Sequence, residues 1–165
     1  MIHERFKHNF ASNDNTIELK RKAVLRADHI ITVSNSTKKD LIEIYKINEN
    51  KITTIYHGIY PALTEENISN QKKLFSKPYL LYVGNRAGYK NFDLLIKAIG
   101  LSKKIKTNIN LVTFGGPPLS GQEMKLIKSV GLELNQVIYI NGNDSILSNL
   151  YQNAEAFVFP SLYEG

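Results

Sequence analysis

The second half of the chain alternates between short apolar runs and longer segments with helical periodicity. The apolar runs occupy residues 79–83, 109–114, 137–140 and 156–159. Between the first two runs, Phe92, Leu95 and Ile99 recur at spacings of three and four, which is typical of the buried face of a helix. Strands that alternate with helices usually form a parallel sheet, so the pattern predicts an α/β fold in which helices flank that sheet. The predicted helices occupy residues 91–102, 120–130 and 144–153, with Asp144 as the N-cap of the last one.

The first half carries a smaller version of the same pattern. It predicts a helix at residues 13–26, a strand at 29–33, a helix at 36–45 and a strand at 51–56. We expect Ser36 or Thr37 to cap the second helix and Asp40 to lie in its first turn. Ser34, at the end of the first strand, is expected to be a cap or turn residue. This half therefore predicts one βαβ unit.

Residues 58–78 separate the two patterns and have the composition of a linker. The segment is polar, contains Gly58, Pro61 and Pro78, and shows no strong period. We therefore expect two domains, at residues 1–57 and 79–165. Both are expected to be incomplete, because two strands make a small sheet for a domain and no covering helix follows the last strand.

The composition narrows the classes of function without choosing one. The 165 residues include no cysteine, which excludes disulfides and thiolate metal sites. No apolar run approaches the roughly 20 residues needed to cross a bilayer. The formal net charge is +6, but the lysines form scattered pairs rather than one stripe with interleaved aromatic residues, so nucleic-acid binding is not favoured. Attraction to a phosphate-bearing ligand or to an anionic membrane stays open, beside the simpler interpretation of a lysine-rich surface.

Two cations and two glycines share the turn that follows the strand at residues 79–83. Ligands of a parallel sheet bind beyond the carboxyl ends of the strands, which is where this turn lies. Gly84 allows a close approach of the backbone, and the helix that follows turns its free N–H groups toward the same place. Arg86 and Lys90 can then hold phosphate oxygens. The turn favours a diphosphate ligand, and the alternative is that both cations are simply solvated.

Three further loops follow strands and so reach the same rim of the sheet. They carry Gly115 and Gly116, then Asn141, and finally Glu164. Glu164 is the only carboxylate in the last loop, and it is either an ion-pair partner of the two cations or an acceptor for sugar hydroxyls. The sequence contains neither G-x-G-x-x-G nor G-x-x-x-x-G-K-[ST], so neither a dinucleotide fingerprint nor a P-loop is indicated.

Five stretches of the chain carry a combined pattern. They are "RADHIITVSNSTKKDLIEIY", "KITTIYHGI", "YLLYVGNRAGYKNFDLLIKAI", "NLVTFGG" and "LYQNAEAFVFPSLYEG". In this order and spacing they resemble the group-1 glycosyltransferases (family 4), and the final Pro-Ser-x-x-Glu-Gly is the most specific part. The resemblance covers nearly the whole chain. It implies the GT-B fold, which consists of two Rossmann-like domains.

The resemblance also implies roles for residues of the rim. In this family the nucleotide-diphospho-sugar donor binds the second domain and the acceptor binds the first. Arg86 and Lys90 match the residues that hold the donor diphosphate, and Glu164 matches the first Glu of a Glu-x7-Glu pattern, which touches the donor sugar and is the expected catalytic residue. The remaining expected donor contacts are Gly84 and Asn85 at the diphosphate, and Gly115, Gly116 and Asn141 at the nucleotide or sugar. No cofactor and no metal ion are expected, because the cations and the helix end stabilise the departing diphosphate.

As an activity, the resemblance implies a retaining hexosyltransferase of cell-surface polysaccharide synthesis. The expected donor is GDP-mannose, with UDP-sugars as the alternative, and the expected acceptor is a glycan or a lipid-linked sugar. The expected location is the cytoplasm, with peripheral contact at the inner face of the membrane left open. The second Glu of the pattern would fall beyond Gly165, so we expect this chain to lack part of the active site and to be inactive alone. The competing interpretations are a non-catalytic module that binds a nucleotide or phosphosugar, and an epimerase-like GT-B enzyme.

Overall fold

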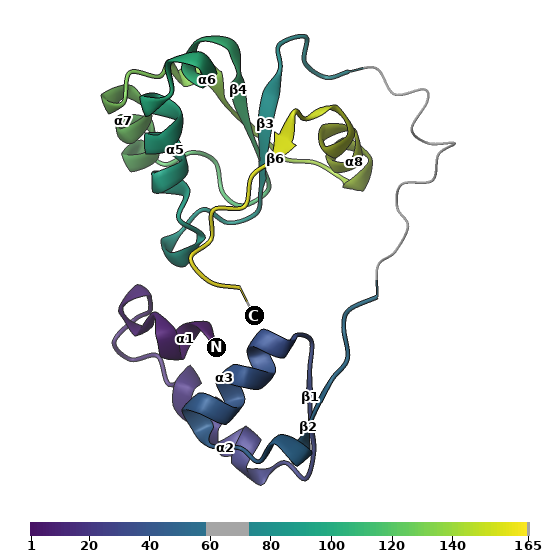
Figure 1. Cartoon of the computed structure of the whole chain (residues 1–165). Helices are drawn as coiled ribbons and strands as arrows, with labels where there is room; N and C mark the ends of the chain where they lie inside the picture. The colour runs from purple at the N-terminus through teal and green to yellow at the C-terminus, as the bar shows by residue number, and fades with distance from the viewer. Residues whose placement is uncertain (59–72, 165) are drawn as a thin grey trace. The chain divides into compact units, whose positions relative to one another are not determined.

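The computed structural model describes residues 1–58 and 73–164 (Figure 1). The chain divides into two compact units, one of residues 1–60 with 163–165 and one of residues 61–162. Most of the predicted linker, residues 59–72, lies outside the described residues. The described end of that linker belongs to the second unit, because Phe75 packs on its core and its ring centroid lies 5.4 Å from that of Tyr79.

The first unit contains the predicted βαβ arrangement. Its elements are α1 (Ile2–Arg5), α2 (Thr16–Arg26), β1 (Ile30–Thr32), α3 (Asn35–Tyr45) and β2 (Ile52–Thr54). The two strands are parallel, with Ile30 opposite Ile52. A small core of Leu41, Ile47 and Ile52 lies between helix α3 and this sheet. The sequence did not predict α1, which has only four residues and no apolar period.

Helix α3 begins earlier than the sequence predicts. Ser34 is the N-cap, since its backbone is extended and its Oγ accepts a hydrogen bond from the Thr37 N–H at 3.0 Å. The prediction of Ser36 or Thr37 as the cap is therefore wrong, while the cap role expected of Ser34 is confirmed. The shift moves Asp40 out of the first turn, and the side chain is buried rather than solvated.

The second unit is a four-stranded parallel sheet with helices on both faces. Its strands are β3 (Tyr79–Val83), β4 (Asn110–Phe114), β5 (Val137–Ile140) and β6 (Ala156–Phe157), in the order β5-β4-β3-β6. Its α-helices are α5 (Phe92–Leu101), α6 (Lys103–Asn108), α7 (Gly121–Ser129) and α8 (Asp144–Asn153). All strand pairs are parallel, which confirms the predicted fold class.

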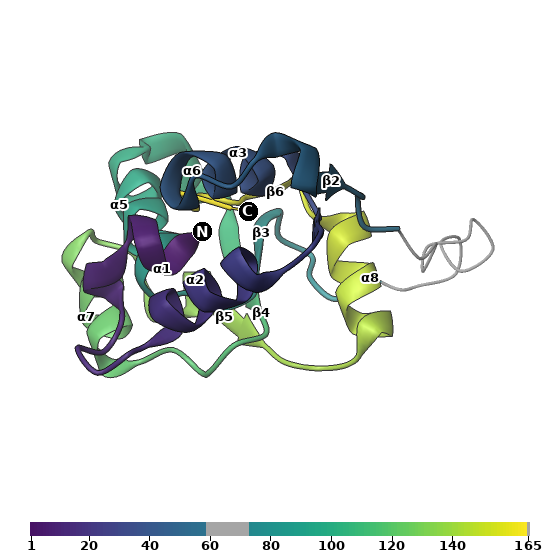
Figure 2. The same ribbon diagram turned by 90° about the horizontal axis from the view of Figure 1, so that it is seen from below.

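Alternate residues of the strands build two separate cores. Tyr82 and Leu111 face helices α5 and α7, whereas Leu81 and Val112 face helix α8. Figures 1 and 2 show α5 and α7 on one side of the sheet and α8 on the other. The central strands are therefore buried on both faces, which explains why they read as continuous apolar runs.

Three details of the second unit differ from the sequence prediction. Helix α6 was not predicted, because residues 103–108 have no apolar face; it starts where the Ser102 Oγ accepts from the Ile105 N–H. Helix α8 is capped by Asn143, whose Oδ1 accepts from the Ile146 N–H at 3.1 Å, so the prediction of Asp144 as the cap is wrong by one residue. Strand β6 ends at Phe157, two residues before the predicted end.

The last strand and the residues after it are partly uncovered. Phe157 is 46% exposed and Phe159 is 48% exposed, and Val158 is half-buried. Among the helices of residues 1–58 and 73–164, none is long and apolar enough to cross a membrane.

Candidate functional site

The four strand ends of the second unit meet at one rim, because all four strands are parallel. The strand order reverses between β3 and β6, since the chain runs outward from β3 to β4 and β5 and then returns to the other side of β3. In open parallel sheets, ligands bind in the crevice at such a reversal. The loops that border it are residues 84–91 after β3 and residues 158–162 after β6.

Hydrogen bonds join these two loops directly. The Leu162 N–H donates to the Tyr89 carbonyl at 2.9 Å, and the Asn91 side-chain amide donates to the Pro160 carbonyl at 3.1 Å. Asn91 has a left-handed backbone, with φ of 59°, and directly precedes helix α5. Asn91 precedes the helix in this left-handed conformation and not in the extended one typical of an N-cap, and in the described part of the chain no side chain caps helix α5.

Lys90 lies at this strand-order reversal. It ends the short 3-10 turn Gly88–Lys90, and its Nζ lies 5.1 Å from the ring centroid of Phe159 and 5.2 Å from that of Tyr89. These distances are within the range of cation–π attraction. The residue is half-buried, so the aromatic rings hold the ammonium near the crevice while water still reaches it.

Ser161 is a candidate site residue that we did not predict from the sequence. Its hydroxyl oxygen is buried, and among the described residues it has no hydrogen-bond partner. A buried hydroxyl without a partner is uncommon in folded proteins and calls for an explanation. Ser161 is the serine of the Pro-Ser-x-x-Glu-Gly stretch, which was the signal available in the sequence.

The glycines of the rim allow two loops to touch. Gly84, Gly115 and Gly116 all have positive φ, at 111°, 75° and 67°. A Cβ on Gly116 would lie 3.0 Å from the Gly84 carbonyl oxygen, which is closer than almost all real contacts of a Cβ. The Gly84 N–H also donates to the Phe114 carbonyl at 2.8 Å. Gly116 therefore serves the packing of loop on loop, whereas the predicted contacts of all three glycines with a donor stay a prediction.

Arg86 is buried, unlike the solvated cation that was the alternative in the sequence analysis. Its Nε donates to Glu123 Oε1 at 2.7 Å, and its Nη1 donates to the Gly115 carbonyl at 3.4 Å. Its Nη2 donates to the carbonyls of Pro117 and Pro118. Four of the five N–H donors of the guanidinium are thus used within the chain. The rings of Phe92 and Tyr139 lie 5.6 Å and 5.8 Å from its central carbon.

Glu123 is the counter-charge of Arg86 and also part of a helix cap. Its Oε2 accepts from the Ser120 N–H at 2.6 Å, while the Ser120 Oγ accepts from the Glu123 N–H at 3.2 Å, which completes a capping box for helix α7. Burial raises the pKa of the Glu123 carboxyl, but the hydrogen bonds from Arg86 and Ser120 outweigh burial and hold the pKa below its usual value. Glu123 is therefore ionised at neutral pH.

A cavity of about 660 Å³ opens beside this ion pair, between the loops after β3 and β4. Its lining residues are Asn85, Arg86, Ala87, Gly88, Asn91, Phe92, Asp93, Pro117, Pro118, Ser120, Gln122, Glu123 and Leu126. The cavity lies on the β4 side of β3, whereas the strand order reverses on the β6 side. We place the candidate site at the reversal, because the topology of the sheet directs ligands there.

The remaining predicted residues are exposed. Asn85 is exposed, and its Oδ1 accepts from the Ala87 N–H at 3.2 Å. Asn141 is exposed after β5, and its Oδ1 accepts from the Gly142 N–H at 3.0 Å. Glu164 is exposed and belongs to the first unit, not the second, so its place in the donor rim stays a prediction.

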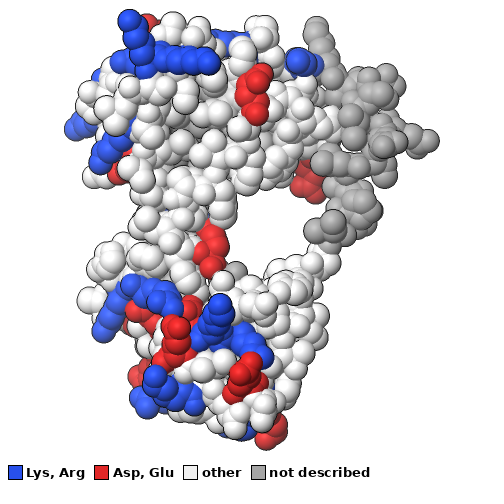
Figure 3. Space-filling model, viewed as in Figure 1, with Lys and Arg blue, Asp and Glu red and all other residues white. Residues whose placement is uncertain are grey.

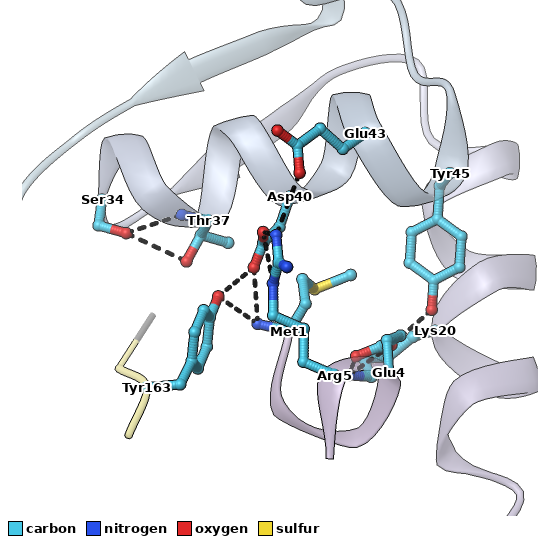
Figure 4. Close-up of polar contacts among 10 residues, drawn as sticks. All are labelled: Met1, Glu4, Arg5, Lys20, Ser34, Thr37, Asp40, Glu43, Tyr45 and Tyr163. Atoms are coloured by element: carbon cyan, nitrogen blue, oxygen red, sulfur yellow. Dashed lines mark hydrogen bonds and ion pairs between the residues drawn. The ribbon is translucent and has the colours of Figure 1, made fainter. Parts of the chain in front are cut away.

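The first unit has a polar cluster of its own, centred on Asp40 (Figure 4). The buried Asp40 carboxylate accepts from Arg5 and from the Tyr163 hydroxyl, and the Met1 ammonium lies 3.5 Å away. Burial raises the pKa of Asp40, but these hydrogen bonds outweigh it and the pKa lies below its usual value. Burial, together with the hydrogen bond to Asp40, raises the pKa of Tyr163 to about 12. The cluster thus holds one carboxylate firmly ionised and one phenol firmly protonated.

The described residues hold no group of side chains suited to a metal ion. Within residues 1–58 and 73–164, no three His, Asp or Glu side chains gather as metal ligands would. On the face of the first unit seen in Figure 3, basic and acidic side chains are interspersed. The ion pairs of this unit include Lys38 with Glu49 and Lys22 with Glu18.

Family models match the entire chain in two parts. The model described as glycosyl transferases group 1 matches residues 64–165, and the model described as glycosyltransferase family 4 matches residues 1–63. The boundary between the two matches falls inside the predicted linker. Both matches agree with the resemblance found in the sequence.

Curated relatives of this chain are also named as glycosyltransferases. A glycosyltransferase of Campylobacter jejuni, named as an N-acetylgalactosaminyltransferase acting on a diphospho-undecaprenol, is 31% identical over 85% of this chain and 37% of its own length. An O-antigen chain mannosyltransferase of Salmonella typhimurium is 30% identical over 89% of this chain and 39% of its own length. The chain thus spans less than half the length of these relatives.

The structural similarity extends to distant enzymes. The crystal structure of WaaG, a glycosyltransferase involved in lipopolysaccharide biosynthesis, matches with a TM-score of 0.72 at 19% identity, over 96% of this chain and 46% of that one. A glycosyltransferase from Rickettsia africae matches with a TM-score of 0.63 at 22% identity, over 94% of this chain and 44% of that one. The chain therefore belongs to the group-1, family 4 glycosyltransferases and has the α/β architecture of the GT-B fold.

Proposed function

We propose that this chain carries the donor-diphosphate site of a retaining hexosyltransferase, at the point where the strand order reverses between β3 and β6. The observation that carries the proposal is that three features lie on the two loops that hydrogen bonds join at this reversal. Lys90 brings a positive charge, helix α5 begins there without a side-chain cap, and the buried Ser161 hydroxyl has no partner among the described residues. A diphosphate supplies acceptor oxygens for all three.

Sugar transfer requires groups that stabilise negative charge on the leaving phosphate. When the bond between the sugar and the diphosphate breaks, negative charge grows on the leaving phosphate. A fixed ammonium and free N–H groups stabilise that charge more strongly in the transition state than in the ground state. Such groups can do this without a metal ion, so we propose a metal-independent reaction with no cofactor besides the sugar nucleotide.

Arg86 has a different place in this proposal from Lys90. Since four of its five donors are used on Glu123 and on loop carbonyls, Arg86 offers a diphosphate at most one free N–H without breaking existing bonds. Its charge still contributes to the potential at the rim. We therefore assign most of the direct diphosphate contact to Lys90, and a smaller direct share to Arg86.

The remaining roles rest on membership in the family. We propose that Glu164 touches the donor sugar and that Gly115, Gly116 and Asn141 lie near the nucleotide. We also propose that attack occurs on the face from which the diphosphate departs, with the leaving phosphate accepting the proton of the acceptor hydroxyl. The configuration at the anomeric carbon is then retained.

For the donor we propose GDP-mannose, and for the acceptor a glycan or a lipid-linked sugar. Relatives of this chain include proteins named as an O-antigen chain mannosyltransferase and as a transferase to a diphospho-undecaprenol sugar. A lipid-linked acceptor would place the enzyme in the cytoplasm with peripheral contact at the membrane, toward which a net charge of +6 is favourable.

Calorimetric titration of the chain with GDP, UDP, ADP and guanosine tests the diphosphate site. We expect one nucleoside diphosphate to bind at least tenfold more tightly than its nucleoside. Lys90→Ala should abolish most of that difference, whereas Lys97→Ala, on an exposed face of helix α5, should preserve it. Equal affinity for GDP and guanosine in the unmodified chain, with no preference for UDP or ADP either, would contradict the proposal.

A further inference from the structure

We propose that Glu123 is a positioning residue for donor binding, because it holds Arg86 and, through Arg86, the loop of residues 115–118. The inference rests on the proposed diphosphate site. It goes beyond that site, since Glu123 lies outside the motifs that identify the family and carries the same sign of charge as the ligand.

The first step is the burial of the Arg86 charge. The Arg86 side chain is only 3% exposed, and Glu123 provides the ion pair that makes such burial tolerable. The hydrogen bond from Nε to Oε1, at 2.7 Å, also fixes the rotation of the guanidinium plane. The other edge of that plane is thereby directed at the loop after β4.

Arg86 in turn binds that loop through hydrogen bonds. Its two terminal nitrogens donate to the carbonyls of Gly115, Pro117 and Pro118. Neither proline has an N–H, so the loop has few ways to bind itself in place. Two successive glycines with positive φ add conformational freedom. Strand β5 also binds the start of this loop, since the Gly115 N–H donates to the Ile140 carbonyl at 3.1 Å and the Tyr139 hydroxyl donates to the Gly116 carbonyl at 2.9 Å. Arg86 adds the hydrogen bonds to the two prolines that follow.

The third step explains why Glu123 can serve as a rigid anchor. Its second carboxylate oxygen is bound to the Ser120 N–H within the capping box of helix α7. Both oxygens are therefore engaged, one by the helix start and one by Arg86. A carboxylate held in this way orients its partner with little loss of freedom when a ligand binds.

A positioning role and simple electrostatics predict opposite changes in GDP affinity when the Glu123 charge is removed. A carboxylate near a diphosphate repels it, so electrostatics alone predicts tighter binding of GDP to Glu123→Gln. If Glu123 instead positions Arg86 and the loop, the variant should bind GDP at least fivefold more weakly. Guanosine affinity should change by less than twofold, since the nucleoside lacks the diphosphate.

Asp93 offers a matched control. Asp93 lines the same cavity as Glu123, but in the described part of the chain it forms no hydrogen bond or ion pair with Arg86. Asp93→Asn removes the same charge near the same loops. We expect its GDP affinity to stay the same or to rise, which would separate positioning from the effect of charge.

A second measurement needs no ligand and guards against a variant that folds poorly. Amide hydrogen exchange at Gly115 and Gly116, followed by NMR, should be at least tenfold faster in Glu123→Gln than in the unmodified chain or in Asp93→Asn. The Arg86 Nε–H resonance should keep its protection from exchange when GDP is added to the unmodified chain.

These outcomes decide the proposal. Weaker GDP binding together with faster loop exchange in Glu123→Gln supports it. Unchanged or tighter GDP binding, unchanged loop exchange, or transfer of the Arg86 Nε–H from Glu123 to a phosphate would overturn it. If the folded, unmodified chain binds no nucleoside diphosphate, the proposed function fails. The exchange comparison alone then decides whether Glu123 holds the loop.

Discussion

Each unit contains one buried ion cluster, and the two clusters differ in which partner, the anion or the cation, is buried. In the first unit the anion is the buried partner: the Asp40 side chain is 4% exposed, while Arg5 is 40% exposed. In the second unit the cation is the buried partner: Arg86 is 3% exposed and Glu123 is 16% exposed. Removing one partner therefore has different consequences, because Arg5 can turn to water whereas Arg86 cannot.

The difference also separates the roles of the two clusters. Arg5 and Tyr163 reach Asp40 from other parts of the first unit, so that cluster joins distant residues around one carboxylate. Arg86 reaches three backbone carbonyls of a single loop, so its cluster shapes that loop. The Arg86 cluster thus fixes one loop at the sheet rim, whereas the Asp40 cluster ties several segments of the first unit together.

The largest expected effect is that of Glu123→Ala. The variant leaves the Arg86 charge buried without a partner, so we expect the free energy of unfolding to fall by about 3 kcal/mol. Urea denaturation followed by circular dichroism measures this change. The double variant Arg86→Met with Glu123→Leu should lose less than Glu123→Ala alone, because no charge stays buried. A double variant that is less stable than the single one would show that hydrogen bonds to the loop, not the buried charge, dominate.

Asp40→Asn should cost less, about 1–2 kcal/mol of unfolding free energy at neutral pH. The amide still accepts one hydrogen bond, and the exposed Arg5 can bind water. The comparison between the clusters is contradicted if Asp40→Asn proves as destabilising as Glu123→Ala under the same urea conditions. Glu155→Ala, at an exposed position, serves as the reference substitution.

The same cluster predicts a loss of stability in acid. The pKa of Asp40 is lower in the folded chain than in the unfolded one, where it is about 3.9. Its contribution is therefore complete above that value and is lost as the pH falls through the lower folded pKa. Unfolding free energies measured between pH 6 and about pH 3 should decline less steeply in Asp40→Asn than in the unmodified chain. Parallel slopes would show that Asp40 does not titrate differently in the two states.

The smallest expected effect concerns Tyr163 and alkaline pH. Its pKa is about 12 in the folded chain, above the value of about 10 for an unfolded tyrosine. The stabilisation is thus complete below about pH 10 and is lost as the pH rises toward the folded value. The ultraviolet difference titration between the unmodified chain and Tyr163→Phe should show one phenol ionising near pH 12. A difference centred near pH 10 would mean that Tyr163 is not bound to Asp40 in solution.

Periodic patterns in the sequence predicted the elements of the fold well. Strands buried on both faces, such as β3 and β4, are visible as apolar runs, and helix α5 is visible through its face of Phe92, Leu95 and Ile99. Helix α6 has no such face, so nothing in its sequence marked it. Helix starts were predicted less well, because Ser34, Ser36 and Thr37 are all good caps and only the backbone geometry selects Ser34.

The candidate site was harder to predict, because contacts distant in sequence decide it. Arg86 and Lys90 stand four residues apart, yet one is buried on Glu123 and the other lies against Phe159. No local pattern records that Arg86 and Glu123, 37 residues apart, form a pair. The buried Ser161 hydroxyl, which has no partner among the residues that the structure describes, likewise depends on packing, although its motif was recognised. The ends of the predicted strands thus located the rim. The sequence could not predict whether each side chain there is buried, paired or exposed.

The most direct test of the central claim is to map the binding of GDP on the chain by NMR. If the donor diphosphate binds where the strand order reverses, the largest shifts should fall on the backbone amides of Tyr89, Lys90, Asn91 and Ser161. Weaker shifts should reach Gly115 and Gly116 through the touching loops. Shifts confined to the cavity around Ser120 and Leu126, or no shift in a folded chain with GDP, UDP or ADP, would contradict the account.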